Sequence, residues 1–288
     1  MKNVYGRLKK YISQYINKNS NSWDDVEVYF IISTGRTATK FLATYLQENY
    51  STKVLAMHEP TPDLLNTGIK YLRKEITKDG LLNHIKLNRS LQCKKVNKST
   101  PHKIYIESNN NVLTSIEELE KVFPKVKFIH VTRDPLTYVG SSLNKINKGK
   151  AEYTMYSEAD NRPRITAKDY NGDAFSLEWD NFSQFQKVSW YWNKTNRMIL
   201  DYKAKNNNII TIKYEDIFFD NNNAGLYKML DFIGLKQEDS LEKFALNSKV
   251  NVSLGKKDLN YDNWSEKEQQ FFKNVVSSTA KELNYTLE

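Results

Sequence analysis

The sequence predicts an α/β fold, a single domain in which a central parallel β-sheet is flanked by helices. Apolar runs of strand length alternate along the chain with segments of helical spacing, the pattern of a parallel sheet covered on both faces. The chain has 288 residues, 39% hydrophobic and 12% aromatic, which suffices for the core of one large domain. It contains no internal repeat and no Pro/Gly/Ser linker. In sheets of this kind, ligands bind where strands end and the next helices begin.

Five strands and a series of helices are expected. The strands are predicted at residues 26–33, 52–57, 103–106, 126–131 and 209–213. Helices are predicted at 5–16 (within an N-terminal segment, 1–22), 37–47, 63–91, 115–123, from Pro135 onward, and at 182–205, 225–233, 241–246 and 266–283. The polar stretch 148–182 carries scattered aromatic residues and is long for a connection. It is predicted to be an insertion or lid beside the ligand site, or else a disordered loop.

Charge and cysteine content restrict the class of protein. The formal net charge of +9 favours anionic partners, although a lysine-rich composition that keeps the protein soluble explains it equally well. Cys93 is the single cysteine, so an intramolecular disulfide and a cysteine-based metal site are excluded. No apolar run is long enough for a signal peptide or a membrane helix, so we expect a soluble, cytoplasmic protein. A weak membrane-surface association of the N-terminal helix stays open.

The turn after the first strand has the chemistry of an anion site. It reads Ser33-Thr34-Gly35-Arg36-Thr37-Ala38-Thr39-Lys40 and leads from a buried strand into a helix. A helix N-terminus offers free backbone N–H groups and a positive dipole end, to which two cations and several hydroxyls are added here. It is not a nucleoside-triphosphate P-loop, because no Ser or Thr follows a Gly-Lys pair. An ordinary strand-to-helix turn with a threonine N-cap is the alternative.

A second such turn follows the fourth strand. Arg133 stands at the carboxyl end of that strand, and Ser141 lies eight residues further, about two helical turns. A guanidinium and a hydroxyl placed this way can converge on one tetrahedral anion. Arg133 could instead pair with Asp134 or cap the sheet.

The three strand ends together resemble the PAPS-dependent sulfotransferases, where PAPS is 3'-phosphoadenosine-5'-phosphosulfate. Residues 32–39 resemble the family's 5'-phosphosulfate loop, and Arg133 with Ser141 resembles its 3'-phosphate motif. Ile212-Lys213-Tyr214-Glu215-Asp216-Ile217 is similar to the family's strand ending in Tyr-Glu-Asp-Leu. The resemblance spans about residues 26–235 and implies the P-loop-NTPase-like sulfotransferase fold. Ala38 stands where the family usually has Gly, Lys40 replaces the usual second hydroxyl, and Arg36 favours the carbohydrate or bacterial type over the phenol type.

The resemblance also implies a mechanism and a set of site residues. PAPS would be the co-substrate, its product 3',5'-adenosine bisphosphate (PAP), and no metal would be needed. The donor would be bound by Thr34, Gly35, Arg36, Thr37, Ala38, Thr39, Lys40, Arg133, Ser141 and, less firmly, Lys256. Arg36 would stabilise the leaving phosphate, and Glu59, 23 residues after it, would be the general base, with His58 as the second choice.

The acceptor side is less defined by the sequence. Ser108 and Asn109 end the third strand and, with Glu59, are predicted to line the acceptor substrate, a hydroxyl or amine compound for which a carbohydrate or glycolipid is preferred. Two alternatives remain at this point. One is a kinase-like phosphotransferase, which would need the Gly-Lys-Ser/Thr pattern that is missing. The other is a non-catalytic module for anionic ligands such as nucleic acid, whose basic residues would gather in one stripe, whereas here they are spread along the chain.

Overall fold

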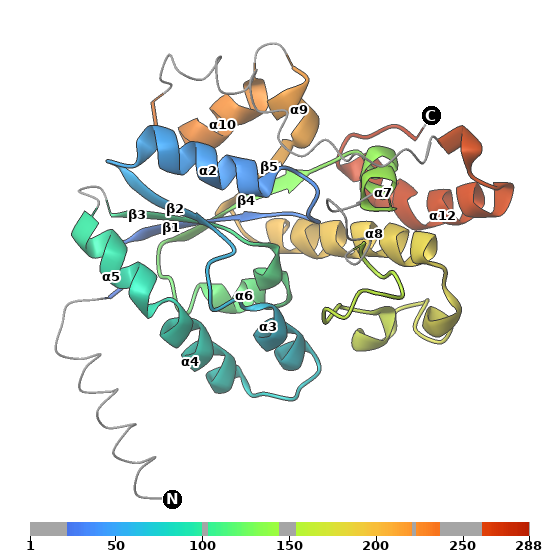
Figure 1. Ribbon diagram of the computed structural model, residues 1–288, viewed down its shortest axis with the longest axis horizontal. Helices are drawn as coiled ribbons and strands as arrows, with labels where there is room; N and C mark the ends of the chain where they lie inside the picture. Colours follow the sequence, from blue (N-terminus) through green and yellow to red (C-terminus); the bar gives the residue numbers. More distant parts are fainter. Residues whose placement is uncertain (1–21, 100–102, 144–153, 221–222, 237–260, 288) are drawn as a thin grey trace, which may run out of the picture.

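Five parallel strands form the centre of the protein (Figure 1). The computed structural model describes residues 22–99, 103–143, 154–220, 223–236 and 261–287. The strand order is β2-β3-β1-β4-β5. The strands are β1 (Glu27–Ile32), β2 (Val54–His58), β3 (Ile104–Ser108), β4 (Val126–Thr132) and β5 (Ile209–Lys213). The predicted α/β class with a central parallel sheet is thereby confirmed. Because all strands run the same way, their carboxyl ends meet at one edge, with β1 and β4 side by side.

Helices cover both faces of the sheet because side chains alternate along each strand. On β1, Phe30 packs into one hydrophobic cluster and Ile31 into the other. One face carries α2 (Thr39–Tyr50), α9 (Tyr214–Phe218) and α10 (Ala224–Ile233). The opposite face carries α3 (Leu65–Leu72), α4 (Lys78–Asn88), α5 (Ser90–Ser99) and α6 (Ile116–Leu119). Short 3-10 helices complete the connections: η1 (Asn110–Ser115), η2 (Ala167–Asp169), η3 (Trp179–Asn181) and η4 (Tyr261–Asn263).

A third cluster of apolar residues lies beyond the carboxyl edge of the sheet. It joins α7 (Pro135–Leu143), α8 (Gln184–Lys203) and α12 (Glu266–Glu282). Helix α8 begins with a capping box formed by Ser183 and Gln186 and buries Trp190 and Trp192. This long helix therefore ties the strand ends to the C-terminal helix, as Figure 1 shows. No helix among the described residues is both long and apolar enough to cross a membrane.

The predicted strands and most predicted helices agree with the structure, and the differences concern where helices begin and end. The helix predicted at 63–91 is divided into α3 and α4, because Lys74 adopts a left-handed φ of 61° after α3 and Thr77 caps a new start. A third helix, α5, begins at Ser90 and was not predicted. The helix predicted at 115–123 is the shorter α6, which follows the 3-10 helix η1 and ends at Leu119, and α9 was not predicted. The helices predicted at 5–16 and 241–246 lie outside the described residues, as does the predicted donor residue Lys256.

A fully buried ion pair ties α4 and α5 to the sheet. Arg89 donates from Nε and Nη2 to the Glu107 carboxylate at 2.6 and 2.7 Å, and neither side chain is exposed. Tyr105 and Asn109 also donate to Glu107, at 2.6 and 2.7 Å. The four hydrogen bonds offset the desolvation of the carboxylate; losing one member of such a pair typically costs about 3–5 kcal/mol. The network lies directly below the carboxyl end of β3.

Side chains occupy the backbone groups of both outer strands. On β2, the N–H of Ala56 donates to Oε1 of Gln47 at 2.8 Å. On β5, the carbonyl of Thr211 accepts from Nζ of Lys228 at 3.0 Å, and its hydroxyl accepts from Nζ of Lys203 at 3.0 Å. Covering an edge strand with side chains of neighbouring helices is one device against its pairing with further strands.

A neutral histidine lies inside the sheet. Nε2 of His130 on β4 is 2.9 Å from Oδ1 of Asn196 on α8, and the ring has no solvent exposure. Burial lowers its pKa to about 4, against a weaker opposing effect of the hydrogen bond to Asn196. Between pH 4 and about 6.5, the unfolded chain therefore binds a proton that the folded protein does not.

We expect this histidine to make the free energy of unfolding fall as the pH falls. The unfolded state binds more protons, so stability present at pH 7 is lost through the range below about 6.5, by about 2 kcal/mol at pH 5. Urea unfolding at pH 7 and pH 5 should show a smaller loss for His130→Gln than for the wild type. The exposed His84 gives the control, and His84→Gln should keep the wild-type difference. Equal losses in wild type and His130→Gln would contradict the assignment.

Candidate active site

The loop between β1 and α2 is held open by backbone torsions and by an internal hydroxyl network. Gly35, Arg36 and Ala38 have positive φ angles of 80°, 57° and 55°. Ser33 accepts at Oγ from the N–H of Gly35 at 2.9 Å and from the hydroxyl of Thr37 at 2.8 Å. Ala38 is the N-cap of α2 and provides no side-chain cap, so the first N–H groups of the helix face an uncapped end. This arrangement suits an anion.

Arg36, Arg133 and Ser141 come together at this loop. Nη1 of Arg133 donates to the carbonyl oxygen of Arg36 at 2.7 Å, and Nε of Arg36 donates to Oγ of Ser141 at 3.1 Å. Burial lowers the pKa of Arg36, and the nearby charge of Arg133 lowers it further. Two cations are therefore held close to each other at adjoining strand ends. An anion between them would relieve their repulsion.

Arg133 is positioned by residues from three other elements. Its guanidinium carbon lies 4.6 Å from the ring centroid of Tyr214, a cation–π contact. Its carbonyl accepts from Nε1 of Trp192 at 2.9 Å. Glu215 accepts from the N–H of Asp134 at 3.0 Å and from the hydroxyl of Tyr285 at 2.9 Å. The Tyr-Glu-Asp segment after β5 thus fixes the residue predicted to bind the 3'-phosphate.

Sequence reasoning missed this role of Tyr214. The available signal was its place directly after β5, since β5 neighbours β4 and both strands end at the same edge.

The remaining predicted donor residues line the loop between β1 and α2. Thr34 is buried, Thr39 opens α2, and Lys40 is exposed on its first turn. The hydroxyl of Thr37 donates to Ser33. Thr37 can therefore bind an anion through its backbone N–H.

The end of β2 places Glu59 and His58 beside the end of β3. Glu59 has a φ of 40°, uncommon for a residue other than glycine, and its N–H donates to the carbonyl of Ser108 at 3.0 Å. Its carboxylate is 4.0 Å from Nε2 of His58 and partly exposed. Burial lowers the pKa of His58, partly opposed by the charge of Glu59 and reinforced by that of Lys40. The His58 imidazole is therefore neutral at neutral pH. The effect of Lys40 also shows that the first turn of α2 is close to His58.

Ser108 and Asn109 are fully buried at the same place. Oγ of Ser108 has no hydrogen-bond partner among the described residues. Asn109 donates to Glu107 at 2.7 Å and accepts from the N–H of Asn111 at 2.9 Å, so its amide supports β3 and η1. Their contact with a substrate stays a prediction.

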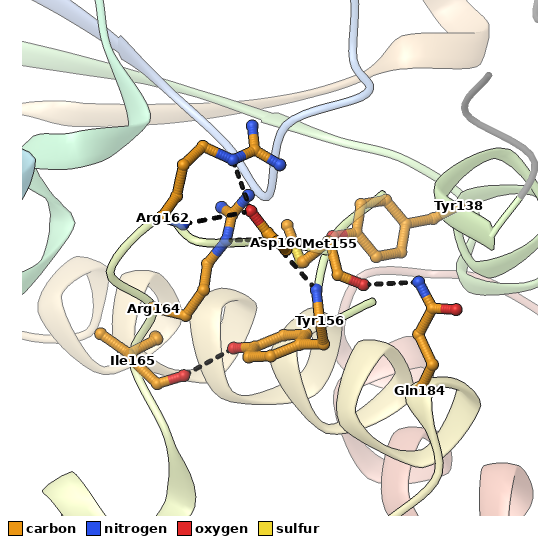
Figure 2. Close-up of polar contacts among 8 residues, drawn as sticks. All are labelled: Tyr138, Met155, Tyr156, Asp160, Arg162, Arg164, Ile165 and Gln184. Carbon is orange, nitrogen blue, oxygen red and sulfur yellow. Dashed lines mark hydrogen bonds and ion pairs between the residues drawn. The ribbon is translucent and has the colours of Figure 1, made fainter. Parts of the chain in front are cut away.

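Tyr156 and two arginines of the 154–165 segment lie near Tyr138 of α7 (Figure 2). The hydroxyl of Tyr138 donates to the carbonyl of Thr34 at 3.3 Å, which joins α7 to the loop. Burial raises the pKa of Tyr138, and the charges of Arg164 and Arg36 oppose this rise. Arg164 thus lies within electrostatic reach of the same hydroxyl as Arg36. The segment predicted as an insertion or lid stands beside the candidate site, although its function as a lid stays a prediction.

A family model matches this arrangement of strand ends. The model for the sulfotransferase family covers residues 29–239, more than half of the chain. The chain belongs to the sulfotransferase family. The prediction of a PAPS-dependent sulfotransferase is confirmed at the level of the family, which favours it over the kinase-like and non-catalytic alternatives. The roles of individual residues in this sulfotransferase are not decided by the match.

Solved sulfotransferase structures share the fold. A sulfotransferase domain from the curacin biosynthetic pathway is 15% identical, with a TM-score of 0.54 over 92% of this chain and 100% of that one. The sulfotransferase STF9 from Mycobacterium avium is 11% identical, with a TM-score of 0.55 over 97% of this chain and 82% of that one. Identities this low establish the fold alone. No curated protein sequence matches the chain significantly.

We expect Tyr214 to contribute to donor binding through Arg133. Replacing its ring in Tyr214→Leu should raise the Kd for PAP by about threefold to thirtyfold, since a cation–π contact is worth about 0.5–2 kcal/mol. Tyr214→Phe keeps the ring face and should bind PAP like the wild type. Calorimetric titration with PAP measures all three proteins. Loss of binding in the phenylalanine variant would point to the hydroxyl instead.

Proposed function

We propose that this sulfotransferase moves the sulfuryl group of PAPS to a hydroxyl of a carbohydrate or glycolipid. The contact between Arg133 and the carbonyl of Arg36 carries the proposal, because it places two cations from adjoining strand ends at one site. PAPS carries negative charge at both its 5'-phosphosulfate and its 3'-phosphate. A site with paired arginines at an uncapped helix end suits such a donor. Lys256 lies outside the described residues and stays a predicted donor contact.

Arg36 and the amides of the loop would bind the 5'-phosphosulfate end. Arg133, stacked on Tyr214, would bind the 3'-phosphate together with Ser141, whose hydroxyl accepts from Arg36. When the acceptor oxygen attacks sulfur, a new S–O bond forms and the bond from sulfur to the bridging oxygen breaks. The electron pair stays on the 5'-phosphate of PAP, where negative charge builds up. Fixed cations and N–H groups stabilise that charge without reorganising.

Glu59 is our choice of general base. The proton of the acceptor hydroxyl would pass to its carboxylate as the new S–O bond forms. Its partial exposure and its place at the carboxyl edge of the sheet support this role. The neighbouring His58 is neutral at neutral pH and could take the same proton, so the two residues need separate variants.

Arg133→Ala should abolish the stabilisation of the protein by PAP. At a ligand concentration of about thirty times Kd, the wild type gains about 2 kcal/mol of unfolding free energy. Arg197→Ala is the control, because Arg197 pairs with Asp201 and Glu282 on the surface and should leave the gain unchanged. Thermal unfolding with and without PAP, and with ATP for comparison, measures the effect. A full gain in Arg133→Ala would remove this residue from the donor site.

Glu59→Gln should bind PAP normally and lose turnover. Removing a general base typically costs about 10²- to 10⁴-fold in rate. His58→Gln should retain most of the rate if Glu59 is the base. Single-turnover transfer from PAPS, followed by mass spectrometry of the sulfated product, compares the two variants. Near-normal rates for Glu59→Gln with a large loss for His58→Gln would exchange the two assignments.

A further inference from the structure

A buried carboxylate gathers two arginines in the segment between α7 and η2. Oδ1 of Asp160 accepts from Nε of Arg162 at 2.6 Å, and Oδ2 accepts from Nε of Arg164 at 3.0 Å (Figure 2). Only 1% of the Asp160 side chain is exposed. Burial favours its neutral form, but the two arginines outweigh burial and hold its pKa below the usual range. With Asp160 ionised, the three side chains carry one net positive charge.

The geometry of Arg164 differs from that of the structural arginines of this protein. Arg89 grips Glu107 with Nε and Nη2, and Arg73 grips Asp169 with Nε and Nη2 at 2.7 and 3.3 Å. Arg164 gives only Nε to Asp160. Among the described residues, none accepts a hydrogen bond from its two Nη groups. The pairing with Asp160 therefore orients Arg164 and leaves its two Nη groups for another anion.

Arg164 and the proposed base Glu59 both act electrostatically on the same tyrosine. Burial raises the pKa of Tyr191 on α8, the charge of Arg164 lowers it, and the charge of Glu59 raises it. The charges of Arg164 and Arg36 likewise both lower the pKa of the Tyr138 hydroxyl, which itself donates to the carbonyl of Thr34 in the donor loop. Arg164 is therefore within electrostatic reach of tyrosines that also sense the proposed base and the donor loop. The Arg164 side chain is 19% exposed, so it is accessible while most of it is shielded from water.

We propose that Arg164, oriented by Asp160, binds a carboxylate of the acceptor substrate. The substrate class is then a hydroxyl compound that already carries an acidic group, of which a uronic acid glycoside is the carbohydrate form. This inference rests on the proposed function, since it uses the same donor site and base. The carboxylate would sit on the planar fork of Arg164 while the hydroxyl reaches Glu59. Arg164 would pair with the carboxylate at one end of the substrate, and this contact would position the reacting hydroxyl at the other end.

Two matched substrate pairs test the proposal. Methyl β-D-glucuronide is compared with methyl β-D-glucoside, and 3-hydroxyphenylacetate with 3-methylphenol, each pair differing in a carboxylate. Sulfated product formed from PAPS by the full chain is quantified by mass spectrometry. We expect the acidic member of a pair to have a kcat/KM at least about tenfold above the neutral one. A preference for neutral members, equal use of both, or turnover of neither pair would overturn the inference.

Variants separate recognition of charge from support of the segment. Arg164→Gln should remove the preference by lowering kcat/KM for the acidic member about tenfold or more, with the neutral one changed less than twofold. Arg164→Lys should restore part of it. Arg73→Gln is the matched control, because Arg73 donates to the carbonyl of Arg164 and to Asp169 but faces no proposed substrate group. It should affect both members alike. A preference that survives Arg164→Gln contradicts the proposal.

PAP binding tells this inference apart from the proposed function. Arg164→Gln should keep the wild-type thermal stabilisation by PAP, which also shows that the variant is folded. If wild type itself is not stabilised by PAP, the donor assignment fails. If PAP stabilises both proteins but the acidic substrates have no higher kcat/KM than the neutral ones, only the assignment of Arg164 fails.

Discussion

The hydrogen bond from Arg133 to the carbonyl of Arg36 governs the layout of the site. It joins the carboxyl ends of β1 and β4, and it holds two cations at a distance where the charge of Arg133 lowers the pKa of Arg36, in addition to the larger effect of burial. The surrounding fold makes this arrangement stable: Trp192 fixes the end of β4, and Tyr214 covers the guanidinium face. The fold thus holds the Arg36 and Arg133 guanidinium groups close together before any donor binds. An incoming polyanion meets charges that need no rearrangement, which is the condition for strong stabilisation of a developing negative charge.

Much of this could be predicted from the sequence because it follows from local pattern and one topological rule. The apolar run before Ser33 and the one before Arg133 identify two buried strands, and in a parallel sheet all carboxyl ends share an edge. That rule brings Arg36 and Arg133 to the same side of the protein. It does not make them neighbours. Their contact depends on β1 lying beside β4, a strand order that the sequence does not contain.

The remaining features depend on contacts between distant residues. Nothing local in the sequence indicates that Ala38 and Glu59 adopt left-handed torsions, since both residues usually avoid them. The 148–182 stretch was equally compatible with a disordered loop, because the pairing of Asp160 with two arginines gives no periodic pattern. The break between α3 and α4 shows the same limit. A continuous charged helix was favoured by composition, and packing against η1 decided otherwise.

The side chains on both outer strands restrict how copies of this protein can meet. Gln47 occupies a backbone donor of β2, and Lys228 occupies a backbone carbonyl of β5. A further strand from another copy would have to displace these groups and bring lysine charges together. Extension of the sheet by a strand from another copy is therefore opposed at either side by the loss of one of these hydrogen bonds.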